Sequence, residues 1–553
     1  MTSDATLLSI QGLTVGLPHG ADRQHAVADV SLDLRRNEIL CVVGESGSGK
    51  SVMSRAVTGL FPSRHVQPQA GRILFEGEDL LQAPAARLRQ LRGNRIGMIF
   101  QEPMTALNPM LRIGAQIDEV LEIHQVADAA TRRARVLELL TAVNLPQPQE
   151  ILLAYPHQMS GGQRQRAMIA MALALEPDIL IADEPTTALD VTTQAQILTL
   201  IRDLQRKKSM GVIFVTHDFG VVAEIADRIA VMQHGRLVEQ GPAQQVLQAP
   251  QAAYTRSLLA AVPSLTPGAK REFSAQPVVL EVQDLSKRYR SGGGLFGKGG
   301  RSVDALKSVS FRVRRGETVG IVGESGSGKS TAARCIARLI DADSGHIHLE
   351  GTDIAGLDPR AMRPLRKRLQ MVFQDPFGSL NPRRTVGQLI AEGPIVHGTR
   401  PDAAHARTLE LLALVGLDPR SVDRFPHEFS GGQRQRIGLA RALALSPSVL
   451  IADEPVSALD VSVQAQVLQL LADIRDRLGL TVLFITHDLR VAAQVCDTIV
   501  VMHQGSVVES GPVAQVYAHP EHDYTRALLA AVPGRQWSQG AASGSALAAK
   551  GSE

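Results

Sequence analysis

The chain has 553 residues, 44% of them hydrophobic, which is enough for two to four domains with full cores. A formal net charge of only +3 argues against nucleic acid as the default partner. The three cysteines, Cys41, Cys335 and Cys496, include no close pair, so we expect neither a disulfide scaffold nor a zinc or iron–sulfur site.

Membrane-spanning and secreted classes are also disfavoured. No apolar run approaches the ~20 residues that a helix needs to span a bilayer. The N-terminus lacks the basic-then-apolar pattern of a secretion signal. We therefore expect no membrane span and action on any membrane from outside the lipid. We interpret the cysteines as small buried thiols, which suits a reducing cytoplasm.

The first element with recognisable chemistry is GESGSGKS at residues 44–51, which follows a strand-like apolar run and recurs at residues 323–330. Both copies fit G-x-x-x-x-G-K-[ST]. In this pattern backbone N–H groups cradle the β-phosphate, the lysine contacts the β/γ oxygens and the serine hydroxyl binds Mg²⁺ at a helix N-terminus. Two copies predict two bound nucleotides, each with Mg²⁺. The predicted phosphate-binding residues are Gly44, Glu45, Ser46, Gly47, Ser48, Gly49, Lys50 and Ser51, then Gly323, Glu324, Ser325, Gly326, Ser327, Gly328, Lys329, Ser330 and the adjacent Thr331.

An S-G-G-Q tetrapeptide opens a helix-like run in each half of the chain. Its residues are Ser160, Gly161, Gly162 and Gln163, and then Ser430, Gly431, Gly432 and Gln433. Serine is a good N-cap, so the motif can be a cap followed by a glycine turn. It can equally be an anion site, in which N–H groups and the positive helix end face a phosphate. The residues alone leave both interpretations open.

Two carboxylates end a predicted buried strand in each half. Residues 179–184 end in Asp183 and Glu184, and residues 449–454 end in Asp453 and Glu454. Ligands bind at the carboxyl ends of strands in α/β sheets. There the aspartates suit Mg²⁺, directly or through water, and the glutamates suit the attacking water as a general base or orienting group.

His217 and His487 close the apolar runs at residues 212–216 and 482–486. A lone histidine at a strand end is more often a structural hydrogen-bonding residue. Its recurrence in register with the glutamate favours a γ-phosphate contact. Gln101 and Gln374, each after a strand-like run, are a third candidate element that spacing alone does not single out.

Duplication extends through the whole chain. Lys50 and Lys329 lie 279 positions apart, whereas Asp183 and Asp453 lie 270 apart, so insertions and deletions fall in the front part of each unit. A period this long indicates a duplicated domain and not a solenoid. We place the domains at residues 7–262 and 278–533, with a linker at 263–277. Residues 291–300, rich in glycine, are interpreted as a flexible hairpin loop, and the tail at 534–553 as disordered.

The order phosphate loop, Gln, S-G-G-Q, Asp-Glu strand, A-L-D and His, present twice, resembles the ATP-binding subunits of ABC transporters over about residues 7–533. The resemblance implies an α/β fold of two ABC-type P-loop ATPase domains. Each would have a RecA-like core with a parallel sheet, an antiparallel β subdomain and a helical subdomain. It implies that S-G-G-Q is the signature motif, which completes the ATP site of the opposite unit, and it places the two glutamines with the serine and aspartate around Mg²⁺. The D-loop matches are Ala188-Leu189-Asp190 and Ala458-Leu459-Asp460.

A narrower resemblance, to the oligopeptide/dipeptide/nickel importer branch, is carried by residues 100–109 and 373–382 and by Tyr-Thr-Arg at 254–256 and 524–526. It implies a fused pair of ATPase subunits that powers import of peptides or related solutes, similar to glutathione or microcin/oligopeptide importer ATPases. The implied partners are two membrane-spanning permease subunits and, through the complex, a periplasmic binding protein. The implied location is the cytoplasmic face of the bacterial inner membrane. Many members carry a cysteine-rich C-terminal iron–sulfur segment, which this sequence lacks.

The alternative function is that of a soluble tandem ABC protein acting on ribosomes or DNA. Such relatives typically carry a long charged helical linker, a coiled coil or zinc cysteines, and none is found in this sequence. An inactive regulatory module is disfavoured because both units keep the lysine, the aspartate, the glutamate and the histidine.

In this family an aromatic residue near the start of each unit stacks on adenine, and Tyr289 fits that role. Aligning Leu13 with Leu285 places Leu17 at the equivalent position. Base–aromatic stacking is worth ~1–3 kcal/mol in nucleic-acid systems, so we expect the site built on Lys50 to bind ATP more weakly. The alternative is that Tyr289 is only an edge-strand residue.

Overall fold

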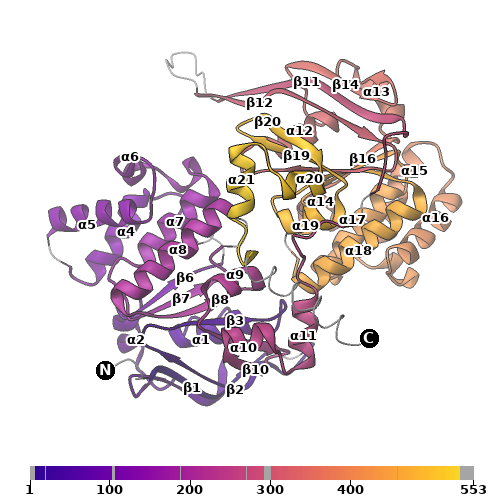
Figure 1. Cartoon of the computed structure of the whole chain (residues 1–553). Coiled ribbons are helices and arrows are strands. Elements are labelled where there is room, and N and C mark those ends of the chain that lie inside the picture. Colours follow the sequence, from indigo (N-terminus) through magenta and orange to yellow (C-terminus); the bar gives the residue numbers. More distant parts are fainter. Residues whose placement is uncertain are drawn as a thin grey trace, which may run out of the picture. The chain divides into compact units, whose positions relative to one another are not determined.

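The computed structural model describes residues 6–535 except 19, 21, 102–105, 127, 187–188, 269–270, 292–300 and 458. The chain divides into two compact units, Met1–Val262 and Pro263–Val532 (Figure 1). Residues 533–535 group with the first unit, in which the Gly534 N–H donates to Glu224 Oε2 at 3.4 Å. Ala188, Ala458, residues 102–105, the glycine-rich stretch 292–300 and the tail from 536 onward lie outside the described residues.

The first unit is built on a six-stranded sheet. In spatial order its strands are β10 (Arg236–Pro242), β9 (Arg228–Gln233), β3 (Ile39–Val43), β8 (Gly211–Val215), β7 (Ile179–Asp183) and β6 (Ile96–Ile99). All neighbours pair in parallel except β10, which is antiparallel to β9. Every residue of β3, β7 and β8 is buried. Such continuous apolar strands are typical of a parallel sheet that is covered on both faces.

A second, antiparallel sheet covers one face of this core. Its strands, in spatial order, are β2 (His25–Arg35), β1 (Thr6–Gly16), β4 (Pro68–Phe75) and β5 (Glu78–Asp79). Because successive side chains of a strand point to opposite faces, β3 contributes to two cores. Leu40 and Val42 pack with the antiparallel sheet, whereas Ile39, Cys41 and Val43 pack with helices on the other face.

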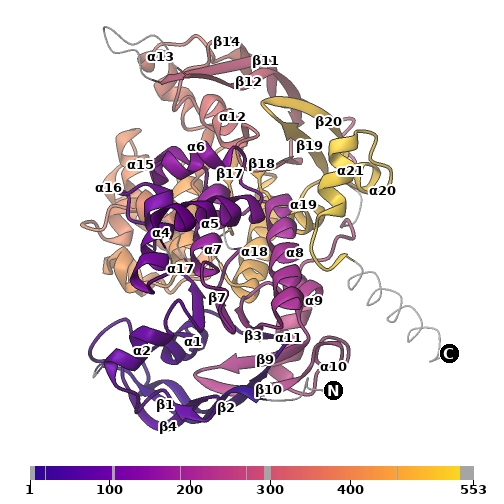
Figure 2. The same cartoon turned by 90° about the vertical axis from the view of Figure 1, so that its left-hand side faces the viewer.

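The helices of the first unit complete the layers. Figure 2 shows β1, β2 and β4 at one end of this unit and α4, α5 and α6 at the other, with β3 and β7 between them. The helices are α1 (Lys50–Thr58), α2 (Ala85–Leu91), α4 (Ile113–Ile123), α5 (Ala129–Ala142), α6 (Pro148–Leu153), η1 (Pro156–Gln158), α7 (Gly161–Ala172), α8 (Val191–Lys208), α9 (Phe219–Ile225), α10 (Ala243–Gln248) and α11 (Ala253–Ala260).

The second unit repeats this plan. Its central sheet runs β16 (Leu369–Val372), β17 (Val449–Asp453), β18 (Thr481–Ile485), β13 (Thr318–Val322), β19 (Thr498–His503) and β20 (Ser506–Pro512). Its antiparallel sheet runs β12 (Arg301–Arg314), β11 (Val278–Ser291), β14 (Ser344–Leu349) and β15 (Thr352–Asp353). The helices are α12 (Lys329–Ile336), α13 (Pro359–Leu365), α14 (Pro376–Ser379), α15 (Val386–Val396), α16 (Pro401–Leu414), η2 (Pro419–Asp423), η3 (Pro426–Glu428), α17 (Gly431–Leu443), α18 (Val461–Leu478), α19 (Leu489–Val495), α20 (Val513–Ala518) and α21 (Asp523–Ala530). The predicted fold class is confirmed.

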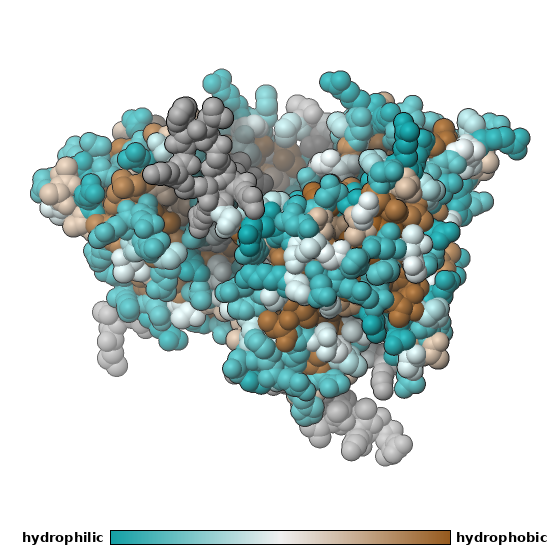
Figure 3. All heavy atoms as spheres, turned by 90° about the horizontal axis from the view of Figure 1, so that it is seen from above, coloured by the Kyte–Doolittle hydropathy of each residue, from teal (hydrophilic) through white to brown (hydrophobic). Residues whose placement is uncertain are grey.

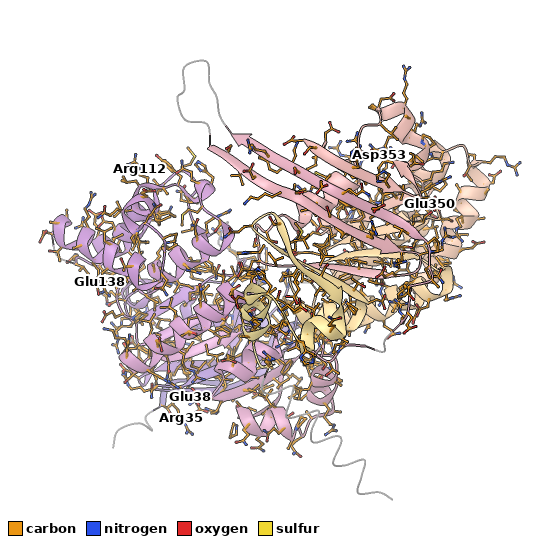
Figure 4. All side chains as sticks on the ribbon, turned by 45° about the horizontal axis from the view of Figure 1, so that its top comes forward. Arg35, Glu38, Arg112, Glu138, Glu350 and Asp353 are labelled. Atoms are coloured by element: carbon orange, nitrogen blue, oxygen red, sulfur yellow. The ribbon has the colours of Figure 1, made fainter. Side chains whose placement is uncertain are left out.

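The same turn leads into the central strand of each unit. Glu38 Oε2 accepts the Arg35 N–H at 2.8 Å between β2 and β3, and Figure 4 labels both residues. Glu317 Oε2 accepts the Arg314 N–H at the same distance between β12 and β13. Each carboxylate therefore fixes the start of the strand whose other end carries GESGSGKS.

The segment that joins the units lies against the second one. Gly268 N–H donates to Ala493 O at 3.1 Å, and Arg271 Nε donates to Asp497 Oδ1 at 2.9 Å. The Arg271 guanidinium also lies 5.0 Å from the centre of the Phe273 ring. Asp497 accepts the N–H of Thr318, the first residue of β13, at 2.9 Å. The segment thus anchors at the amino end of β13, and GESGSGKS follows the carboxyl end of the same strand.

The surface is mostly hydrophilic in the view of Figure 3, with hydrophobic side chains in separate patches. In the part of the chain that the structure describes, no helix has the length and apolarity needed to cross a membrane. All three cysteines are buried, and none forms a disulfide.

Candidate functional site

GESGSGKS forms the turn between the central strand and the next helix in both units. Gly44 (φ 148°) and Gly49 (φ 101°) adopt backbone conformations that L side chains rarely take. A Cβ on Gly44 would lie 2.2 Å from the carbonyl oxygen of Met232, and one on Gly49 would lie 2.4 Å from that of Ala26. Gly323 and Gly328 repeat these conformations, at φ 148° and 103°. The loop path therefore requires glycine at these positions.

The loop lysines are buried and point back into their own loops. Lys50 Nζ donates to the carbonyls of Gly44 at 2.7 Å and Glu45 at 2.9 Å. Lys329 Nζ donates to Gly323 and Glu324, both at 2.7 Å. Each ammonium is thus held against the first two residues of its loop. The backbone N–H groups at the start of α1 or α12 favour an anion beside it.

The loop serine and the strand-end aspartate meet in each unit. Ser51 Oγ donates to Asp183 Oδ1 at 2.8 Å, and Ser330 Oγ donates to Asp453 Oδ1 at 3.2 Å. Burial raises the pKa of both carboxyls above the usual range of aspartate, and the serine hydrogen bonds offset this only in part.

This pair of oxygen ligands fits Mg²⁺. Among the described residues, Asp183 Oδ2 is buried and accepts no hydrogen bond, although the Arg55 guanidinium lies 3.5 Å away. A buried carboxylate oxygen without a hydrogen bond is costly unless a cation neutralises it. A bound Mg²⁺ would add to the positive charge of Arg55 there, and Ser51 with Asp183 would hold it, as Ser330 with Asp453 would in the second unit.

The glutamates after these aspartates contact both of the other predicted polar elements. Gln101 Nε2 donates to Glu184 Oε2 at 3.0 Å, and His217 Nδ1 lies 3.4 Å from Glu184 Oε1. In the second unit Gln374 Nε2 donates to Glu454 Oε2 at 2.8 Å, and His487 Nδ1 lies 3.2 Å from Glu454 Oε1. The structure thus places each glutamine against the glutamate, and its contact with Mg²⁺ stays a prediction.

In the second unit Glu454 and His487 shift each other's pKa in opposite directions. Burial by itself raises the pKa of Glu454, but the hydrogen bond and positive charge of His487 outweigh it, and the pKa lies below the ordinary value. Burial likewise lowers the pKa of His487, yet the Glu454 carboxylate reverses this and the pKa is raised. Glu454 is therefore held ionised, as a general base must be.

The S-G-G-Q motifs cap the helices α7 and α17. Ser160 Oγ accepts the Gln163 N–H at 3.2 Å while Gln163 Oε1 accepts the Ser160 N–H at 3.0 Å. Ser430 and Gln433 form the same capping box, with distances of 3.3 and 3.0 Å. Both serines are exposed. The capping geometry is present, and the contact with a nucleotide of the opposite unit stays a prediction.

The predicted adenine-stacking position differs between the units. Tyr289 lies on β11, 43% exposed, with Lys287 Nζ 6.0 Å from its ring centre. Leu17 follows the last residue of β1 and packs against the core beneath the antiparallel sheet. The exposed ring can receive a base, whereas the leucine side chain is turned to the core.

Sequence reasoning assigned no site role to two tyrosines that contact the loops. Tyr254 Oη accepts the N–H of Glu45 at 3.2 Å, and Tyr524 Oη accepts the N–H of Glu324 at 3.0 Å. Their recurrence within the repeated Tyr-Thr-Arg was the available signal, but about 200 residues separate each tyrosine from its loop.

Two family models match both halves of the chain. The family model described as ABC transporter matches residues 27–187 and 306–457. The model described as oligopeptide/dipeptide transporter, C-terminal region, matches 238–291 and 508–545.

Two relatives align along nearly the whole chain. The peptidoglycan transport ATP-binding protein YejF of Agrobacterium fabrum is 50% identical over 532 residues, which cover 96% of this chain and 97% of that protein. The glutathione import ATP-binding protein GsiA of Escherichia coli is 47% identical over 560 residues, covering 95% of this chain and 89% of that protein. The chain therefore belongs to the ABC transporter family, as a tandem ATP-binding protein that hydrolyses ATP.

Proposed function

We propose that this chain powers the import of peptides or related small solutes through a bacterial ABC transporter. The observation that carries this proposal is the match to the oligopeptide/dipeptide transporter C-terminal region after each ATP-binding domain. The relatives that align over nearly the full chain are named for peptidoglycan transport and glutathione import. The alternative action on ribosomes or DNA receives no support from them.

In each site Lys50 or Lys329 binds the β/γ-phosphate oxygens, and Glu184 or Glu454 takes a proton from the attacking water. Gln101 with His217, and Gln374 with His487, orient the glutamate through the contacts described above. Following the family resemblance, the S-G-G-Q residues of one unit complete the ATP site of the other.

The partners of this chain would be two permease subunits, with a periplasmic binding protein joining through the complex, at the cytoplasmic face of the inner membrane. The helical part of the first unit exposes Met110 (80%) and Ile123 (68%). The buried Gln116 amide donates to the carbonyls of Asn108 and Leu111, at 3.1 and 3.0 Å, and so holds the loop that presents Met110. Methionine is enriched at protein interfaces, so we place Met110 at the contact with a permease subunit.

Purification of the full chain from native membranes tests the proposal. We expect membrane-spanning subunits to co-purify and peptides, with the binding protein, to stimulate ATP hydrolysis. Met110→Asp should lower this co-purification without changing nucleotide binding, whereas Val238→Asp, on β10 and 37% exposed, is the matched control. Recovery of ribosomal proteins or DNA in place of membrane subunits would favour the alternative function.

A further inference from the structure

The hydroxyls of Tyr254 and Tyr524 each contact the second residue of a phosphate-binding loop. The N–H of Glu45 donates to Tyr254 and that of Glu324 donates to Tyr524, at 3.2 and 3.0 Å. Both tyrosines belong to the oligopeptide/dipeptide C-terminal region and lie outside the stretches matched by the ABC transporter model. The contact therefore links that region to the ATP site within each unit.

The helices that carry these tyrosines are anchored at their first turn. Glu239 on β10 accepts the N–H groups of Gln251 and Ala252 at 2.7 and 3.0 Å, just before α11. Glu509 on β20 accepts those of Glu521 and His522 at 2.9 and 3.1 Å, just before α21. Each tyrosine thus approaches its loop from a helix whose N-terminus is fixed to the sheet that carries the loop.

The lysine holds the same peptide segment from its carbonyl side. Lys50 donates to the carbonyls of Gly44 and Glu45, and Lys329 donates to those of Gly323 and Glu324. When a nucleotide binds, the lysine also contacts phosphate oxygens, because its ammonium has three N–H donors. The tyrosine holds this turn from its N–H side, in addition to Arg23, whose guanidinium donates to the Gly47 carbonyl in the first loop. Without the tyrosine hydrogen bond the empty loop can leave the conformation that binds phosphate, so nucleotide binding weakens.

We propose that Tyr254 and Tyr524 are positioning residues that hold the phosphate-binding loops in the nucleotide-binding conformation. They touch no reacting atom and act through the Glu45 and Glu324 peptides. In the second unit the Tyr524 ring also stacks on His503, with ring centres 4.0 Å apart and planes inclined by 22°. Gln233 occupies the position equivalent to His503 in the first unit.

Titration of the full chain with a fluorescent ATP analogue tests the proposal site by site. Lys50→Ala isolates the second site, and in that background Tyr524→Phe should raise the Kd by about 2- to 10-fold, the range of one hydrogen bond. Lys329→Ala isolates the first site for Tyr254→Phe, with the same expected change. The kcat at saturating ATP should stay near that of the parent, so that the effect falls on KM.

Tyr517→Phe is the matched control. Tyr517 lies on α20 and donates to Leu489 O at 2.6 Å, and the first unit has Leu247 at the equivalent position, so that unit does without this hydroxyl. We expect Tyr517→Phe to leave the Kd unchanged.

Hydrogen exchange provides a second readout: the Glu324 amide should exchange faster in Tyr524→Phe with ADP bound. The proposal is overturned if Tyr254→Phe and Tyr524→Phe change neither the Kd for the ATP analogue nor the exchange rate of the loop amide, whatever their effect on Tm. Failure of all variants, including the parent, to bind the analogue would instead contradict the ATP sites themselves.

Discussion

Glu184 and Glu454 occupy a backbone conformation that few residues other than glycine adopt, with φ of 49° and 46°. Their N–H groups donate to Val215 O and Ile485 O, at 3.0 and 2.9 Å, across the ends of neighbouring strands. This turn brings each carboxylate to the glutamine of one strand end and the histidine of another. This backbone conformation costs ~1–3 kcal/mol. At Glu184 and Glu454 it directs the reactive carboxylate toward its partners.

Replacing both glutamates by glutamine keeps their shape and removes the base. Glu184→Gln with Glu454→Gln should bind ATP yet hydrolyse it about 10²- to 10⁴-fold more slowly, which is the usual size of a general-base effect. Steady-state phosphate release from the assembled transporter measures this. Near-normal turnover in the double variant would remove both residues from the mechanism.

Tyr289 and Leu17 predict unequal adenine binding at the two sites. Tyr289→Ala should weaken nucleotide binding at the Lys329 site, and Leu17→Tyr should strengthen it at the Lys50 site. A stacking energy of ~1–3 kcal/mol corresponds to a change of several-fold to about a hundredfold in Kd. Fluorescent ATP titration on single-site variants measures both, with Val278→Ala, on β11 and 37% exposed, as control. Equal affinities that neither change alters would contradict the assignment.

Among the helices and strands, the central strand of each unit is held at its start by a side-chain hydrogen bond and at its end by the backbone conformation of a glycine loop. Glu38 or Glu317 closes the turn before the strand, and glycines with positive φ shape the loop after it. The helix termini are equally defined, since Ser160 and Ser430 form capping boxes with nearly identical distances. A capping box does not by itself distinguish a simple cap from an anion site.

Substitutions at Ser430 that keep the cap separate these two interpretations. Asn and Asp cap helices about as well as Ser, so Ser430→Asn and Ser430→Asp should both leave Tm nearly unchanged. A carboxylate ~4 Å from a nucleotide phosphate costs about 1–4 kcal/mol, so Ser430→Asp should lower the rate of ATP hydrolysis about fivefold or more, and Ser430→Asn far less. Similar rates for the two variants would identify the motif as a cap only.

At the scale of the molecule, one fold occurs twice with differences near the ATP sites. The second unit has Tyr289 and His503 where the first has Leu17 and Gln233. These differences give the two sites distinct surroundings for the same catalytic residues.

Sharing of each ATP between the units is testable by crosslinking. A cysteine at Gly432 is unsuitable, because a Cβ there would lie 2.3 Å from Val463 Cγ1. Ser46→Cys with Ser430→Cys uses exposed positions, and the native cysteines are buried. In the Glu→Gln background, ATP should increase crosslinking of this pair, while Ser46→Cys with Ser160→Cys is the control within one unit. Crosslinking that ATP does not change would contradict the shared sites.

The fold class and the family can both be predicted from the amino-acid sequence. Buried parallel strands read as continuous apolar runs, and phosphate binding needs glycines, a lysine and a serine at fixed local spacing, so both signals are contained in short segments. The duplication strengthened each signal, because every motif recurs in the same order.

Which distant side chains meet is visible only in the folded chain. The carboxyl ends of the parallel strands lie side by side, so they bring Gln101 to Glu184. At the same ends of the strands Tyr254 meets Glu45. The segment at 263–277 read as a linker from its Pro and Gly content, yet Arg271 binds Asp497, more than 200 residues away. Local composition sets the conformations available to a segment, whereas its contacts depend on charges that folding brings near it.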